Sequence, residues 1–222
     1  MPTTWGDIKQ EFRDGFRDVT QNFLGDEELL RNLRRVLRML DNPNGYTFQQ
    51  REQTLTLTGA SSYDLDTVTP GWKEIMTVTN SLGDVSNVPV EMEFVNVKDF
   101  QLILDRYAFT IFAGKELRLY SPTSAPLTGQ LNIIYFTGYL CADATTGLPK
   151  AIPTSDSDYF LIPERFIDAI TEGLLWLSFR KDRSNKDDKA DAKAAFDARK
   201  AELVSLETIQ VQTPHRTMRG AF

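Results

Sequence analysis

The stretch that decides the fold is PERFIDAITEGLLWLSF, residues 163–179, together with the alanine-rich segment that follows it. Its apolar side chains recur at helical spacing along one stripe, and further apolar residues cover most of the remaining circumference. Pro163 suits a first helical turn because its missing N–H is not needed there, and Glu164 and Asp168 face the positive end of the helix dipole. The spacing predicts a buried helix. Its stripe consists of Phe166, Ile170, Gly173, Leu174 and Leu177.

A polar run, residues 180–186, separates this helix from a second one. The inward face predicted for the second helix carries small residues first and large residues last. Because alanine lets helices approach closely, we expect an antiparallel helical hairpin over residues 163–206. That inward face reads Ala192, Ala195, Phe196, Arg199, Leu203 and Leu206.

The first helix of this hairpin is too apolar to be covered by one partner. Trp176 and Phe179 are expected to be core residues rather than a ligand platform, and the number of faces they imply suggests that part of the core is intermolecular. We therefore expect this helix to pack against a neighbouring subunit. The residues concerned are Phe166, Ile170, Leu174, Trp176 and Leu177.

Two further helices are predicted near the N-terminus. Apolar residues at spacings of three or four run from Trp5 to Phe23, and Thr4 followed by Asp7 resembles a helix cap. A leucine stripe indicates a second helix over residues 26–40, which ends at the turn-forming residues 41–45. The face opposite the leucines carries four arginines, Arg31, Arg34, Arg35 and Arg38.

This arginine face allows two interpretations. Charged residues usually face water, which favours a solvated surface. The alternative is contact with an acidic neighbour or with passing DNA phosphates, where the fork of the guanidinium group is useful.

After Gly45 the hydrophobic period changes from that of a helix to that of strands. Strands are predicted at residues 46–48, 53–58, 72–79, 88–95 and 129–137, with a hairpin over residues 108–120 that turns at Gly114 and Lys115. Residues 59–71 are expected to be a loop, and residues 97–104 fit either a short helix or a strand. Because the connections are too short for crossover helices, we expect an antiparallel meander.

This order of elements predicts an α+β fold, in which N- and C-terminal helices form a bundle and an antiparallel β domain is inserted between them. The expected parts are N-terminal helices (1–43), the β domain (44–140), a connecting loop (141–162), the C-terminal helical hairpin (163–206) and an extended tail (207–222). We expect the tail to dock on another surface because it has lost helical periodicity but keeps apolar residues. Its candidate docking residues are Ile209, Val211, Pro214, His215, Met218 and Phe222.

Composition limits the possible functions. Among 222 residues, charged residues make up 25% and hydrophobic residues 41%, as in ordinary globular proteins, and the net charge of −6 argues against general coating of nucleic acid. The single cysteine, Cys141, excludes an intrachain disulfide and a cysteine metal cluster. Neither a signal peptide nor a membrane-spanning segment is expected, because no suitable apolar run is present.

The sequence gives little support for catalysis or for a cofactor. His215, the single histidine, lies in the tail, away from any rigid element that could hold a catalytic base. Gly114 and Lys115 resemble part of a phosphate-binding loop, but Phe109 and Glu116 stand where that motif needs glycine and a hydroxyl residue. We therefore expect no enzyme activity, no cofactor and no metal site.

Several motifs, weak one by one, occur in a recognisable order. Their positions are residues 53–59 (QTLTLTG), 62–65 (SYDL), 71–75 (GWKEI), 107–122, 131–136 and the helix that begins at Pro163. In this order the chain, over about residues 26 to 206, resembles the head-to-tail adaptor (connector) proteins of tailed bacteriophages.

The resemblance implies a structural protein of the virion neck, assembled in the host cytoplasm. It implies a ring, commonly of twelve copies, that lies beneath the portal and links the capsid to the tail. The expected partners are the portal protein, other copies of the chain, a downstream tail or nozzle protein, and DNA that passes through the lumen without sequence-specific binding.

A β-sheet binding module, for a host surface or a carbohydrate, is the alternative, with the helices as an oligomerisation stalk. Exposed aromatic side chains would form the binding platform, although strand alternation places most of them in the core. The candidates are Trp72, Tyr107, Phe109, Tyr120 and Tyr135.

Overall fold

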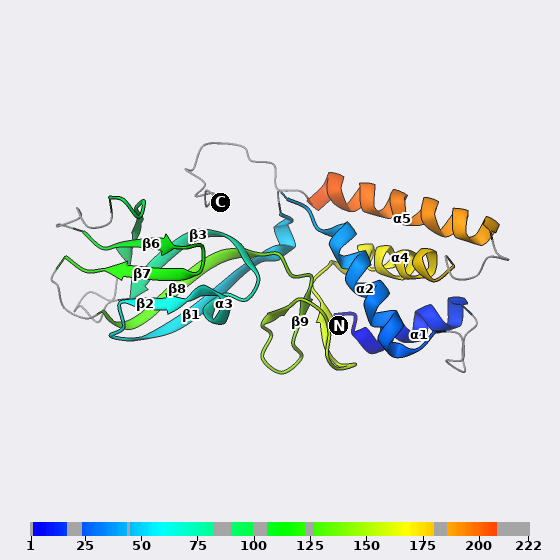
Figure 1. The fold of residues 1–222 in the computed structure, drawn as a ribbon, viewed down its shortest axis with the longest axis horizontal. Coiled ribbons are helices and arrows are strands. Elements are labelled where there is room, and N and C mark those ends of the chain that lie inside the picture. The colour runs from blue at the N-terminus through cyan, green and yellow to red at the C-terminus, as the bar shows by residue number, and fades with distance from the viewer. Residues whose placement is uncertain are drawn as a thin grey trace. The chain divides into compact units, whose positions relative to one another are not determined.

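The computed structural model describes residues 2–16, 24–43, 45–81, 90–99, 106–122, 127–179 and 186–207 (Figure 1). These residues form two compact units. Of these residues, the helical unit comprises those up to Gln49 and those from Gly138 to Glu207, and the sheet unit comprises those within Gln50–Thr137. Each unit has its own hydrophobic core. The predicted α+β class, with terminal helices and an inserted antiparallel β region, is confirmed.

Four helices build the helical unit: α1 (Trp5–Phe16), α2 (Asp26–Leu40), α4 (Asp168–Phe179) and α5 (Lys186–Glu207). The prediction for α2 is confirmed at both ends. The continuation of α1 predicted for residues 17–23 lies outside the described residues. In Figure 1, α5 runs alongside α4, and α4 also packs against α1 and α2.

The start of the predicted apolar helix differs from the expectation. Pro163 precedes a short 3-10 helix, η3 (Glu164–Phe166), because the Phe166 N–H donates to the Pro163 carbonyl three residues earlier. The α-helix itself begins at Asp168, so the acidic residue faces the α4 dipole as predicted. The predicted stripe is buried along its whole length.

Gly173 lies on this stripe, where α4 meets both α2 and α5. A Cβ atom at this position would lie 2.8 Å from Val36 Cγ1 and 3.0 Å from Phe196 Cδ2. Since such separations are shorter than ordinary van der Waals contact, the absence of a side chain allows α4 to approach its two neighbours this closely.

Residues 141–160, predicted to be a connecting loop, instead contain a small three-stranded sheet. Its strands are β9 (Cys141–Ala142), β10 (Pro149–Lys150) and β11 (Tyr159–Phe160), in the order β10-β9-β11. Thr4 bridges Tyr159, and the Phe160 N–H donates to the Thr3 carbonyl. The N-terminal residues therefore continue this sheet and join the start of α1 to it.

The sheet unit contains two four-stranded sheets. In the first, the order is β1-β8-β3-β4, and in the second it is β2-β7-β6-β5. A short helix, α3 (Leu65–Val68), follows β2 and is capped by Asp64. The strands are β1 (Gln50–Thr58), β2 (Ser62–Asp64), β3 (Trp72–Ser81), β4 (Val90–Glu91), β5 (Glu93–Phe94), β6 (Ala108–Phe112), β7 (Glu116–Tyr120) and β8 (Thr128–Thr137).

The connectivity of these sheets corrects the predicted meander. The long strand β8 lies between β1 and β3, and β5 pairs with β6 in parallel. The single strand predicted over residues 88–95 is two short strands in different sheets. They are separated by Met92, which is buried and donates its N–H to Val78. The Met92 side chain is buried in the core of the sheet unit, at the point where the chain passes from the first sheet (β4) to the second (β5).

Other local predictions have mixed outcomes. The predicted β6–β7 hairpin is confirmed, and Ala113 and Gly114 take positive φ values of 51° and 68° in its turn. Residues 46–48, predicted as a strand, instead include the 3-10 helix η1 (Thr47–Gln49), in which the Gln49 side chain accepts the Tyr46 N–H. The loop predicted over residues 59–71 contains β2 and α3. Residues 97–99 form a turn, and residues 100–104 lie outside the described residues.

The contact at Gly173 gives the first testable prediction. Gly173→Ala is expected to lower the free energy of unfolding of the helical unit by about 1–3 kcal/mol, because the added methyl group collides with Val36 and Phe196. Urea unfolding followed by helical circular dichroism measures this change.

Gly15→Ala is the matched control. A Cβ atom there meets the Leu175 methyl groups at an ordinary 3.8 Å, so this variant is expected to gain about 0.5–1 kcal/mol from helix propensity. Equal unfolding midpoints for the two variants would show that the α4 contacts can relax.

Candidate functional site

The outer face of α2 carries a concentration of positive charge. Leu29, Leu33, Leu37 and Leu40 of α2 are buried and Leu30 is partly buried, whereas the four arginines Arg31, Arg34, Arg35 and Arg38 are all exposed. At 100° per residue these four positions fall within an arc of about 100°, so they form one stripe along the helix. We call these four residues the arginine stripe.

The arginine stripe differs from the other described arginines in its lack of partners. None of its four guanidinium groups pairs with a carboxylate of the described residues. The other arginines are held: for example, Arg13 lies 2.5 Å from Asp26, and Arg106 lies 2.7 Å from Glu93. Further pairs are Arg118 with Glu116, Arg165 with Glu207, Arg199 with Asp168 and Glu202, and Arg51 with the Gln50 carbonyl.

The residues predicted to pack against a neighbouring subunit have partners inside the chain. Phe166, Ile170, Leu174 and Leu177 are buried in the core of the helical unit. Trp176 is half-buried and stacks on Phe196 of α5, with ring centroids 5.7 Å apart. The apolar surplus of α4 is therefore covered by α1, α2 and α5, and a contact of α4 with another subunit stays a prediction.

The C-terminal end of α5 is attached to two other segments of the helical unit. Glu207 is 9% exposed and accepts hydrogen bonds from the Thr47 hydroxyl of η1 and from Arg165 of η3. Leu206, predicted to face inward, is instead 59% exposed, because Leu203 and Glu207 occupy the inner face of this last turn. The predicted docking residues lie outside the described residues: Ile209, Val211, Pro214, His215, Met218 and Phe222.

A cluster of titratable groups that the sequence did not reveal lies in the small sheet. The Lys150 ammonium donates to Asp143 at 2.8 Å, to Asp158 at 2.9 Å and to the Thr154 hydroxyl at 2.7 Å. Asp158 is 2% exposed and also accepts the backbone N–H groups of Thr154, Ser155 and Ala144. The spacing of these residues matches no motif, and their proximity depends on how the strands pair.

The electrostatics of this cluster favour the charged forms of all three groups. The Lys150 ammonium and two backbone N–H groups lower the pKa of Asp143 to about 2. Burial alone raises the pKa of Asp158, but its hydrogen bonds with Thr154, Lys150, Ser155 and Ala144 outweigh burial and hold that pKa well below the ordinary value. Asp143 and Asp158 in turn raise the pKa of Lys150. Because both carboxylates are hydrogen-bonded to Lys150 and to backbone N–H groups, the cluster fixes the chain conformation.

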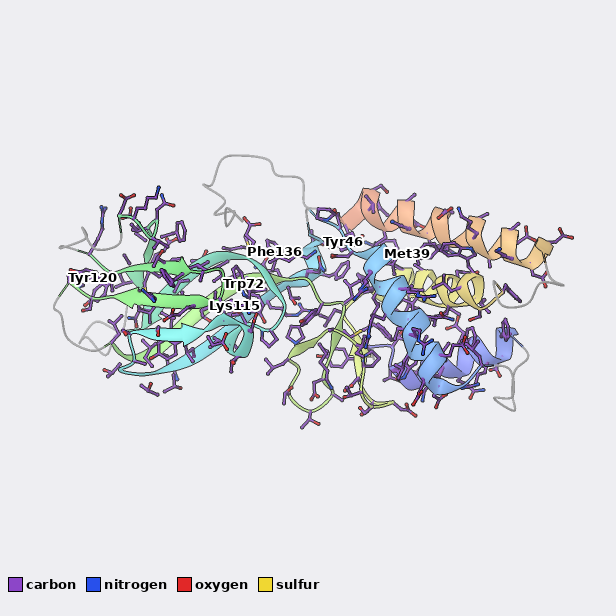
Figure 2. All side chains as sticks on the ribbon, in the orientation of Figure 1. Met39, Tyr46, Trp72, Lys115, Tyr120 and Phe136 are labelled. Atoms are coloured by element: carbon purple, nitrogen blue, oxygen red, sulfur yellow. The ribbon has the colours of Figure 1, made fainter. Side chains whose placement is uncertain are left out.

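The side chains proposed as an aromatic binding platform are not exposed. Phe109 and Tyr135 are each 1% exposed, and burial raises the pKa of the Tyr135 hydroxyl. Trp72 and Tyr107 pack partly buried against the core of the sheet unit, and Tyr120 is half-buried. Figure 2 labels Trp72 and Tyr120, which come from β3 and β7. The sheet unit therefore presents no flat aromatic surface made by these five residues.

The described residues contain neither a candidate metal site nor a candidate membrane-spanning helix. No group of three or more metal-binding side chains there could hold an ion. None of the helices described is both long and apolar enough to cross a bilayer. Burial raises the pKa of the Cys141 thiol, which keeps the described free cysteine in its uncharged form.

Comparison with known proteins gives one clear match. The family model described as "SU10 adaptor protein" matches residues 3–219, nearly the whole chain. The search of curated proteins found no match.

The Lys150 cluster predicts how the stability of the helical unit depends on pH. Above the ordinary aspartate pKa of about 4, Asp143 and Asp158 are ionised in both folded and unfolded chains, and their contribution to stability is complete. Since their pKa values are lowered in the folded state, the unfolded chain binds protons first as the pH falls. Their contribution is then lost as the pH falls towards the lowered values.

Asp158→Asn is expected to lower the free energy of unfolding by about 1–3 kcal/mol near neutral pH, because buried hydrogen-bonding groups lose a charged partner. The difference from the unchanged protein should shrink as the pH falls below about 4, because the unfolded chain then takes up a proton at Asp158 while the lowered pKa keeps the folded carboxylate ionised. Urea midpoints measured against pH test this, with Asp99→Asn, an exposed aspartate of the sheet unit, as control. A difference that stays constant down to the lowest pH would contradict the role given to the ionised carboxylate.

Proposed function

Because the chain belongs to the SU10 adaptor protein family, a family of phage structural adaptors, we propose that it is a head-to-tail adaptor of the virion neck. In this role it forms a ring beneath the portal and links the capsid to the tail around a DNA channel. The observation that carries the proposal is the family match over residues 3–219. The coarser conclusion, a structural component of a phage particle, follows from the family itself.

The partners follow from this role. They are the portal protein, further copies of the chain in a ring of about twelve, as the resemblance implies, and a downstream tail or nozzle protein, with DNA passing through the lumen. The protein acts by binding and not by catalysis, with assembly in the host cytoplasm. We assign the arginine stripe to a charged contact in this assembly, since its guanidinium groups have no partner within the described chain.

The helical unit is suited to form the wall of such a ring. Its core is filled from within by α4, whose side chains hold α1, α2 and α5 in place. The outer faces of α2 and α5 are then free for contacts with other copies, and α4 contributes to those contacts by positioning its neighbours. The alternative, a β-sheet binding module, lacks support because none of its five candidate aromatic residues is exposed.

We assign docking to the tail, residues 208–222, which follows α5 in the sequence. Glu207, the last described residue before it, is held by Thr47 and Arg165. The apolar residues of this segment, among them Ile209, Val211 and Phe222, are the ones proposed to contact the portal or a neighbouring subunit.

Deletion of residues 208–222 is expected to reduce the number of adaptor copies on portal-bearing particles by at least about tenfold, because docking loses its apolar contacts. The measurement is quantitative protein analysis of purified particles, together with images of the portal vertex. Glu207 is kept in the deletion, so the helical circular dichroism should be unchanged. Normal numbers of adaptor copies on particles with the deleted chain would overturn the assignment of the tail.

A further inference from the structure

The helical unit carries a second set of unpaired charges, opposite in sign to the arginine stripe. Asp187, Asp188 and Asp191 lie in the first turns of α5, and all three are exposed. No ion pair or hydrogen bond joins their carboxylates to another described residue. We call these three residues the aspartate turn.

The two sets do not pair with each other among the described residues. No ion pair there joins the arginine stripe to the aspartate turn, although both belong to the same compact unit. Elsewhere in the unit, opposite charges on neighbouring segments do pair, as Arg199 of α5 does with Asp168 of α4 at 3.6 Å. Two complementary surfaces that do not pair within a single copy can do so between copies.

We infer that the arginine stripe of one copy binds the aspartate turn of the next copy in a head-to-tail contact. This inference rests on the proposed ring and names one of its subunit interfaces. A closed ring of identical chains needs a heterologous interface, in which two different surfaces of each copy meet. Charge complementarity between such surfaces fixes the partner and the register, and it speeds association.

The spacing of the two sets suits this contact. The stripe repeats at three and four residues, and with a rise of about 1.5 Å per residue Arg31 to Arg38 span about 10 Å of helix. Asp187 and Asp191 are four residues apart and span about 6 Å. Two or three guanidinium groups can therefore reach carboxylates along one pair of helix faces, and the planar fork of arginine allows two hydrogen bonds to each carboxylate.

A negatively charged partner would stabilise the arginine stripe, because its like charges repel one another. Arginines three and four residues apart on an isolated helix repel one another, and four such pairs occur within the stripe. DNA phosphate would relieve the same repulsion, but the exposed Glu27 lies in the turn just before the stripe and would repel a polyanion. The three carboxylates of the aspartate turn in a second copy are discrete charges that can pair with two or three of the arginines without crossing this acidic turn.

Charge reversal tests the inference on the full-length protein. The double variant Arg34→Glu with Arg35→Glu, and the double variant Asp188→Lys with Asp191→Lys, are each expected to reduce adaptor copies per particle by at least about tenfold, because like charges then face each other. The chain that carries all four changes is expected to regain most of the loss. Lys98→Glu with Lys115→Glu, which reverses two exposed charges in the sheet unit, is the control and should assemble normally.

Each outcome decides the question. Recovery in the four-residue variant supports the contact, because a variant that merely loosened the start of α5 would not recover. Normal copy numbers in either double variant, or no recovery in the combined one, would overturn the contact. If Arg34→Glu with Arg35→Glu lowers the retained DNA and leaves the copy number unchanged, the stripe faces DNA and the inference is wrong. Unaltered protein that is absent from the portal vertex would instead refute the proposed function.

Discussion

The close approach of α4 to α2 and α5 at Gly173 is the contact on which the helical unit depends. A side chain at this position would overlap Val36 on one side and Phe196 on the other. Because α4 is apolar around most of its circumference, it can act as the centre of the unit only if its neighbours come close enough to exclude water. The missing side chain allows this, and it determines which faces of α2 and α5 turn outward.

Local sequence patterns were sufficient to predict a helix where one of its faces is apolar and turn-forming residues mark its end. The leucine stripe of α2 and the turn residues after Leu40 predicted both ends of that helix, and its arginines are exposed as the pattern required. Strands with clear alternation, such as β1 and β8, were also predicted, because a period of two can be read over several residues.

The features that the sequence did not predict depend on contacts between segments that are distant in sequence, and no local pattern indicates such contacts. The strands β9, β10 and β11 have two residues each, which is too short for any period to be recognised. The change of sheet at Met92 reflects a core position, and the cluster of Lys150, Asp143 and Asp158 exists because two strand pairs bring the three side chains together. The sequence also did not reveal that α1, α2 and α5 of the same chain pack around α4, and a contact of α4 with a neighbouring subunit stays a prediction.

The distribution of charge separates folding from assembly in the helical unit. The four like-charged pairs within the arginine stripe each cost about 0.2–0.5 kcal/mol in an isolated helix. The core of the helical unit can offset this loss of stability. On α2 alone it fully buries four side chains, Leu29, Leu33, Val36 and Leu40. The stripe makes no ion pair with the described residues of its own chain, so its charges are available to a partner. An outer surface that is unfavourable alone and neutralised in a complex discriminates more sharply than an apolar one, because a wrong partner leaves its charges unpaired.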